Sequence, residues 1–156
     1  MVQGRWHDAN RPILRRAVLR RAAIRKASLA RGILDHAALR EANLSETDLS
    51  HAQLTGARLD GADLRAAVLR FANLRGASLK AANLQQADLT GAILNTADLT
   101  SANLRWAILA QADLRATNLS HANLVNTSFS GADLTGAMWI DATHRCSNQS
   151  CDGKAY

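Results

Sequence analysis

Residues 82–104 read ANLQQADLTGAILNTADLTSANL, and this stretch contains the pattern that organises the chain. A small residue recurs at every fifth position, and leucine follows two residues after it. The register continues without insertion or deletion from about residue 12 to residue 142. Alanine and leucine dominate these two positions, and the main substitutes are Gly32, Thr47, Thr117 and Thr127 for alanine and Ile24 and Phe129 for leucine.

A period of five suits neither a regular helix nor a straight strand. On an α-helix, five residues advance a side chain by about 140°, so the leucines would spread around the axis. On a straight strand, an odd period sends successive leucines to opposite faces. The small residue and the leucine, being two apart, share one side of a short extended segment. One turn of about 90° per pentapeptide therefore predicts a four-sided coil with leucine inside.

The residue before leucine carries the family resemblance. Ala-Asn-Leu at 42–44 and Ala-Asp-Leu at 62–64, each repeated along the chain, resemble the A(D/N)LXX pattern of the pentapeptide-repeat family. The resemblance implies an all-β fold, a right-handed, four-sided parallel β-helix of about six coils. The short polar side chains of Asn and Asp suit hydrogen bonds to nearby turn backbone. We therefore interpret these residues as turn supports and not as catalytic groups.

The register predicts three segments: an N-terminal cap at 1–11, the β-helix at 12–141, and a C-terminal cap and tail at 142–156. Trp6 and Trp139 are candidates to cover the two ends of the leucine core, Trp139 together with Phe129.

Residues 12–31 permit a second interpretation, as a basic amphipathic helix or an Arg-rich transit segment. The leucine phase, however, runs through them into Leu34, which favours the repeat. Pro12 takes a small position, where its missing N–H is tolerated because no earlier coil precedes the first rung.

Positive charge is concentrated at the start of the chain. The net charge is +6, and residues 1–31 hold nine Lys or Arg against Asp8 alone. We call the following residues of the first coil the basic collar: Arg15, Arg16, Arg20, Arg21, Arg25, Lys26 and Arg31. The collar is consistent with protection of an open β edge, with contact to phosphate or nucleic acid, or with an acidic protein partner.

One side of the rod gathers outward apolar residues. Residues one coil apart stack, so Val68, Asp88 and Ile108 form one outward column, with Phe71 at one corner and Trp106 at the opposite corner two coils along. We call Val68, Phe71, Trp106 and Ile108 the Val68 patch. It is either a scatter of ordinary surface hydrophobes or a docking patch for a protein or a second copy of the chain.

The tail contains the two cysteines, Cys146 and Cys151. Their short spacing permits a disulfide, free thiols, or a zinc site with His144 that lacks a fourth ligand. The tail also resembles disulfide-closed caps of some family members. The compartment follows from this choice: cytoplasmic for a complete chain, periplasmic or secreted for bridged cysteines after removal of a leader. No apolar run approaches the ~18 residues of a membrane span, and arginines interrupt any signal-like segment.

The sequence shows no nucleophile–base pair, glycine-rich phosphate loop or metal-ligand cluster. We therefore expect a non-enzymatic binding or scaffold module without cofactor or metal, whose partner is a protein. The family resemblance implies an alternative: some members mimic duplex DNA, bind type II topoisomerases and protect them from quinolones. Such mimicry requires a negative rod, whereas this chain is basic. Nucleic-acid binding through the basic collar is the third possibility.

Overall fold

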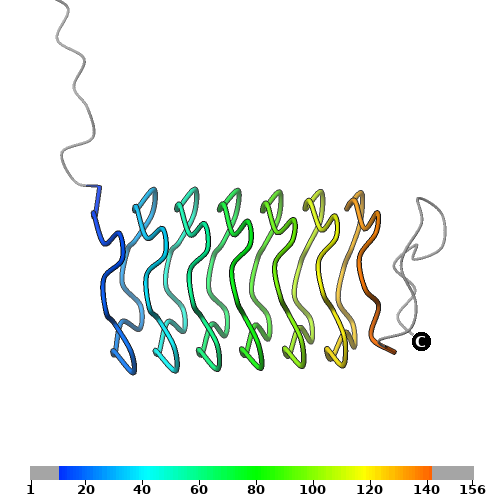
Figure 1. Ribbon diagram of the computed structural model, residues 1–156, viewed down its shortest axis with the longest axis horizontal. Coiled ribbons are helices and arrows are strands. Elements are labelled where there is room, and N and C mark those ends of the chain that lie inside the picture. Colours follow the sequence, from blue (N-terminus) through cyan, green and yellow to red (C-terminus); the bar gives the residue numbers. More distant parts are fainter. Residues whose placement is uncertain (1–10, 142–156) are drawn as a thin grey trace, which may run out of the picture.

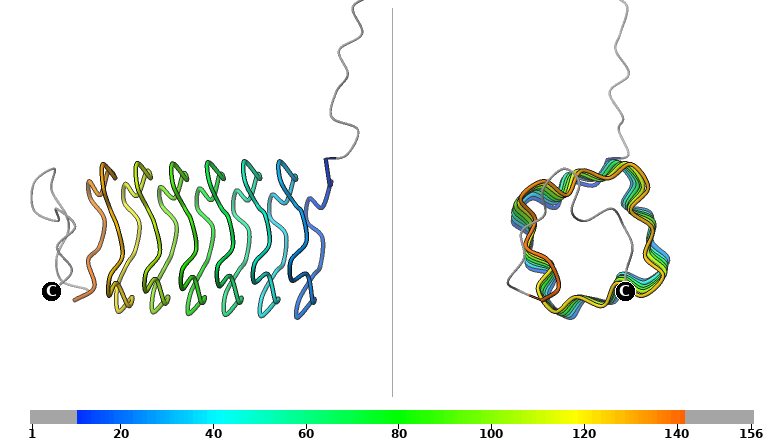
Figure 2. Two further views of the ribbon diagram at one scale, coloured as in Figure 1. Left: turned by 180° about the vertical axis from the view of Figure 1, so that it is seen from behind. Right: turned by 90° about the vertical axis from the view of Figure 1, so that its right-hand side faces the viewer.

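The computed structural model describes residues 11–141, which form a rod of stacked coils (Figure 1). Seen along the rod, successive coils superimpose on one rounded, four-cornered outline (Figure 2). Isolated parallel β-bridges join residues twenty apart, from Ile13↔Ile33 at one end to Asn118↔Met138 at the other. Within these residues there is no helix and no strand longer than a single bridge residue. The predicted β-helical solenoid is confirmed, and residues 12–31 belong to it.

Each corner is a tight turn closed by one backbone hydrogen bond. The Ala87 N–H, for example, donates to the Leu84 carbonyl at 3.0 Å. Every fifth residue from Arg16 to Gly136 has positive φ, which a type II turn requires at its third residue. Glycine adopts this conformation without cost, whereas other residues at these corners lose about 1–2 kcal/mol.

The remaining N–H groups of a repeat bond to neighbouring coils and to one side chain. Asn83 N–H donates back to Ala62, whereas Leu84 and Gln86 N–H donate forward to Asn103 and Arg105, at 2.8–2.9 Å. The last donor, Gln85 N–H, bonds to Oδ1 of Asn83 at 3.2 Å. In other repeats, too, the Oδ1 of Asn or Asp accepts the backbone N–H two residues later, which confirms that these side chains support the turns. The residues are Asn43, Asp48, Asp63, Asn73, Asp88, Asp98, Asn103, Asp113, Asn118, Asn123 and Asp133.

The interior is filled by stacked leucine and alanine. Central leucines such as Leu64 and Leu84 have no exposed surface. Burying each leucine stabilises the fold by about 1.5–3 kcal/mol, and each coil packs only on its neighbours, as in other solenoids. Threonine at a small position remains satisfied: the Thr117 hydroxyl donates to the Leu94 carbonyl at 2.9 Å.

The core is less enclosed at its ends. In the first coil Leu14, Leu19 and Ile24 are half-buried, because no earlier coil among the described residues covers them. At the other end the rings of Phe129 and Trp139 lie with their centroids 6.0 Å apart, and Trp139 packs against the core cluster. Trp6 lies outside the described residues. No helix capable of crossing a bilayer occurs between residues 11 and 141.

Candidate functional site

The basic collar occupies the first coil, but much of its charge is neutralised by the second. Arg21 pairs with Glu41 at 2.5 Å, and Arg25 and Lys26 both pair with Glu46 at 2.5 and 3.4 Å. Arg15 lies 3.6 Å from Asp35. Arg16 and Arg20 form no ion pair within residues 11–141. The collar is therefore one of two paired rings, and Arg16 and Arg20, which lie at two successive corners, form no ion pair with the second ring.

The pKa values of the second-ring carboxyls reflect this pairing. The hydrogen bond from Arg21 lowers the pKa of Glu41, and the hydrogen bond from Arg25 lowers that of Glu46. Both carboxyls are exposed to solvent, so their net contribution to stability is small. The sequence could have predicted these ion pairs, because each acid follows its base by about one coil of twenty residues.

Pairing extends along the whole rod. Nine of the ten acidic residues from Asp35 to Asp133 form an ion pair with Arg or Lys, and Asp48 is the exception. Arg115 serves two of them, with Asp113 at 2.7 Å and Asp133 at 3.7 Å. Cations without an ion pair among residues 11–141 are more numerous: Arg11, Arg16, Arg20, Arg58, Arg75 and Arg105. The unpaired surface charge of the described rod is therefore mainly positive.

Val68 and Ile108 stand in one column, but the members of the Val68 patch do not form one continuous apolar area. The bridges place Asp88 between Val68 and Ile108, and Asp88 pairs with Arg70 at 3.0 Å. Val68 is half-buried, whereas Ile108 is 43% exposed. A charged pair thus separates the two halves of the patch.

Phe71 packs along its own corner and does not reach toward Trp106. Its ring stacks on His51 with centroids 5.2 Å apart, and it fills the space over Gly91, where an added Cβ would lie 2.5 Å from Cε1 of Phe71. The glycine therefore accommodates the ring. Phe71 remains 47% exposed, yet its contacts are intramolecular.

Trp106 has a different set of neighbours, which sequence reasoning missed. Its backbone N–H donates to the carbonyl of Val125 in the next coil at 3.1 Å, and the Arg105 guanidinium carbon lies 4.4 Å from its ring centroid. We call Arg105, Trp106, Ile108 and Val125 the Trp106 corner. Val125 follows Arg105 by one coil, so the twenty-residue register could have found it.

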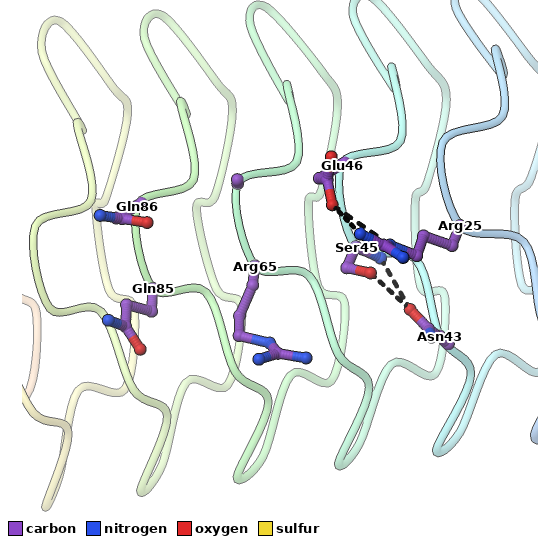
Figure 3. A pocket seen from close by; sticks show the side chains of 8 residues that line it. Arg25, Asn43, Ser45, Glu46, Arg65, Gln85 and Gln86 are labelled. Atoms are coloured by element: carbon purple, nitrogen blue, oxygen red, sulfur yellow. Dashed lines mark hydrogen bonds and ion pairs between the residues drawn. The ribbon is translucent and has the colours of Figure 1, made fainter.

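A separate open groove runs along the side that carries Asn43 and Arg65 (Figure 3). Ala66 leaves a gap on its corner between the longer Glu46 and Gln86, which flank it one coil away on either side. Arg25 is paired with Glu46, and Arg65 makes two hydrogen bonds to Asp63. The groove is polar, but its charged groups are already satisfied, so it offers no free charge to a ligand.

Among residues 11–141 no three His, Cys, Asp or Glu side chains lie close enough to hold a metal ion. Cys146, Cys151 and His144 fall outside the described residues, so the choice between disulfide, free thiols and zinc remains a prediction.

Comparison with solved structures supports the fold. QnrB1 (R167E, trypsin-treated), a plasmid-mediated fluoroquinolone resistance protein, superimposes with a TM-score of 0.65 at 24% identity over 69% of this chain and 52% of that chain. Rfr23, a pentapeptide repeat protein from the cyanobacterium Cyanothece 51142, is 36% identical over 65% of this chain and 63% of that one, with a TM-score of 0.47. This chain thus spans less than two thirds of either protein. No curated protein matches it.

Fold and surface together define a β-helical repeat protein whose outward residues are held in fixed columns. The family model "Pentapeptide repeats (8 copies)" matches residues 24–61, 57–95 and 97–136 of this sequence. The chain belongs to the pentapeptide-repeat family.

Proposed function

We propose that this protein is a non-enzymatic, rigid scaffold that binds a protein partner through its outer faces. The observation that supports this proposal is the regular backbone hydrogen bonding between successive coils, which runs from Leu14 to Met138. A right-handed rod of about six coils, as the sequence predicts, holds outward side chains at intervals of about 4.8 Å. Such pre-organisation reduces the entropy lost on binding.

Paired acids argue against DNA mimicry. A DNA mimic must present free carboxylates, yet nine of the ten acids between Asp35 and Asp133 are neutralised by the rod itself. The similarity to QnrB1 is at 24% identity and supports the shared fold alone. A topoisomerase partner therefore remains the weaker candidate.

Nucleic-acid binding through the basic collar has limited support as well. Affinity for duplex DNA increases with the number of phosphates that free Lys and Arg neutralise. Within the collar, Arg15, Arg21, Arg25 and Lys26 already face carboxylates. A protein partner that complements the remaining positive charge accounts better for the surface.

The proposal is tested by three parallel measurements on the full chain. We expect no inhibition of gyrase supercoiling and no salt-dependent shift of duplex DNA, but specific cross-linking to a protein partner in a lysate of the source organism. Loss of supercoiling without DNA binding would favour the mimic. A DNA shift that weakens steeply with salt, and that disappears in an R16E/R20E variant but not in R58E, would favour the basic collar.

A further inference from the structure

Three of the exposed large hydrophobic side chains in the described rod gather at the Trp106 corner. Trp106, Ile108 and Val125 are 42%, 43% and 46% exposed. The Trp106–Val125 backbone hydrogen bond and the two-residue separation of Trp106 from Ile108 place them around a single corner. Beyond Ile108, Ser128 begins the polar surface of the next coil.

Trp106 has the same left-handed backbone conformation as the other corner residues of the rod. Its φ is 56°, in the left-handed region where a bulky residue is unusual. The corner requires only positive φ, which Ala66 and Gln86 provide in the two preceding coils on the same edge. The fold therefore does not require an aromatic side chain at this corner.

Arg105, next to Trp106, has no carboxylate partner among the described residues. Arg65 and Arg115 each make two side-chain hydrogen bonds to the aspartate two residues earlier. Arg105 has Asn103 at that position and forms no ion pair within residues 11–141. Its Nε is buried and has no hydrogen-bond partner. The terminal Nη1 and Nη2 atoms are not among the buried unpaired atoms, and they can donate two parallel bonds to a carboxylate.

We propose that the Trp106 corner is the docking site for a segment of a partner protein that presents apolar side chains next to an Asp or Glu. The apolar side chains cover Trp106, Ile108 and Val125, and the carboxylate pairs with the Arg105 guanidinium. This inference rests on the proposed scaffold function and identifies its partner as an acidic, amphipathic segment.

Neighbouring charges favour a protein segment over a nucleic acid. Single-stranded nucleic acid requires a row of free cations beside an aromatic platform. The other arginines in line with Arg105, Arg25 and Arg65, are paired with Glu46 and Asp63. Ile108 and Val125 also suit aliphatic or aromatic side chains better than phosphate.

The test selects binders to the full chain from a display library of random peptides, with Phe71→Ser as the matched control for loss of an exposed corner aromatic. We expect enriched peptides to combine Asp or Glu with apolar residues. Trp106→Ser should weaken their binding at least about tenfold. Arg105→Gln should weaken the acidic peptide, while replacement of the peptide acid by its amide should make wild type and Arg105→Gln equivalent. Phe71→Ser should bind as wild type does.

Several outcomes would overturn the site. The site is refuted if no peptides are enriched, or if the enriched peptides lack Asp and Glu. It is also refuted if Trp106→Ser and Arg105→Gln still melt cooperatively and bind the peptides as tightly as wild type does. Salt-dependent binding of a single-stranded oligonucleotide that Trp106→Ser abolishes would assign the corner to nucleic acid instead. If Trp106→Ser retains the cross-linked partner, the scaffold function survives and the site is refuted. If wild type captures no partner while peptides still select the corner, the scaffold function fails independently.

Discussion

At the scale of single residues, the corners balance backbone strain against the side chains of the preceding coil. Gly91 relieves both constraints: its φ is +65°, and its missing Cβ leaves room for the Phe71 ring. Gly61 has the same conformation, at φ +64°, but only Cγ of Glu41 approaches it, at 3.7 Å. Gly61 therefore meets only the requirement for positive φ, whereas Gly91 also meets the need for space beside the Phe71 ring.

We expect Gly61→Ala to lower the free energy of unfolding by about 1–2 kcal/mol, the cost of a left-handed conformation. Gly91→Ala should cost roughly 1 kcal/mol more, because the Phe71 ring must move and lose its stacking on His51. Urea denaturation measures both changes. In a double-mutant cycle, Phe71→Ala should remove the excess at Gly91. Equal costs for the two glycine variants in a wild-type background would show that the ring imposes no constraint.

At the scale of the pentapeptide, the residue before leucine closes the repeat. Asp63 accepts the Arg65 N–H as Asn does elsewhere, and it also pairs with the Arg65 guanidinium. The Arg65 hydrogen bond lowers the pKa of Asp63, and burial opposes this only in part. A carboxyl whose pKa is lower in the folded chain stabilises the fold above its unfolded pKa, and this contribution disappears as the pH falls through the folded pKa.

Asp63→Asn should therefore change the pH dependence of stability and leave the repeat intact, because Asn43 and Asn83 occupy the adjacent positions. Wild type should have the higher Tm at neutral pH. The difference should shrink as the pH falls below the ordinary Asp pKa of about 3.9 and disappear below the lowered pKa of folded Asp63. Thermal melts from neutral to acidic pH measure the difference. A gap that persists undiminished in acid would mean that packing, and not the carboxylate charge, distinguishes the variants.

At the scale of the whole molecule, stability depends on the phase between coils. Each coil bonds only to its two neighbours, and the bridged residues are always twenty apart. An insertion of four complete repeats preserves that spacing, whereas one extra residue moves every later leucine out of line with those before it.

We expect one residue inserted after Gly91 to uncouple the C-terminal coils, which should melt earlier and be cleaved first by protease. An insertion of four repeats copied from residues 92–111 should melt as one cooperative unit close to wild type, because solenoids add coils through the same nearest-neighbour interface. Circular dichroism and limited proteolysis distinguish the two. Indistinguishable melting of both insertions would contradict the coil register.

The sequence by itself determined the β-helical fold, the inward leucines and the turn-supporting role of residues such as Asn83. A pattern repeated at every fifth position determines these features, because each repeat makes the same local turn and the same bonds to the next coil. The same register could also have placed Val125 beside Arg105.

Only the tertiary structure decided where the long outward side chains go. It directs Phe71 over Gly91 and Arg105 over Trp106. It also pairs Arg70 with Asp88, which divides the Val68 patch, and it pairs four of the seven collar cations with three carboxylates. The physical reason is that the repeat specifies the backbone but not the rotamers. An outward side chain settles against whatever the neighbouring coil presents, and that neighbour differs at every corner of the rod.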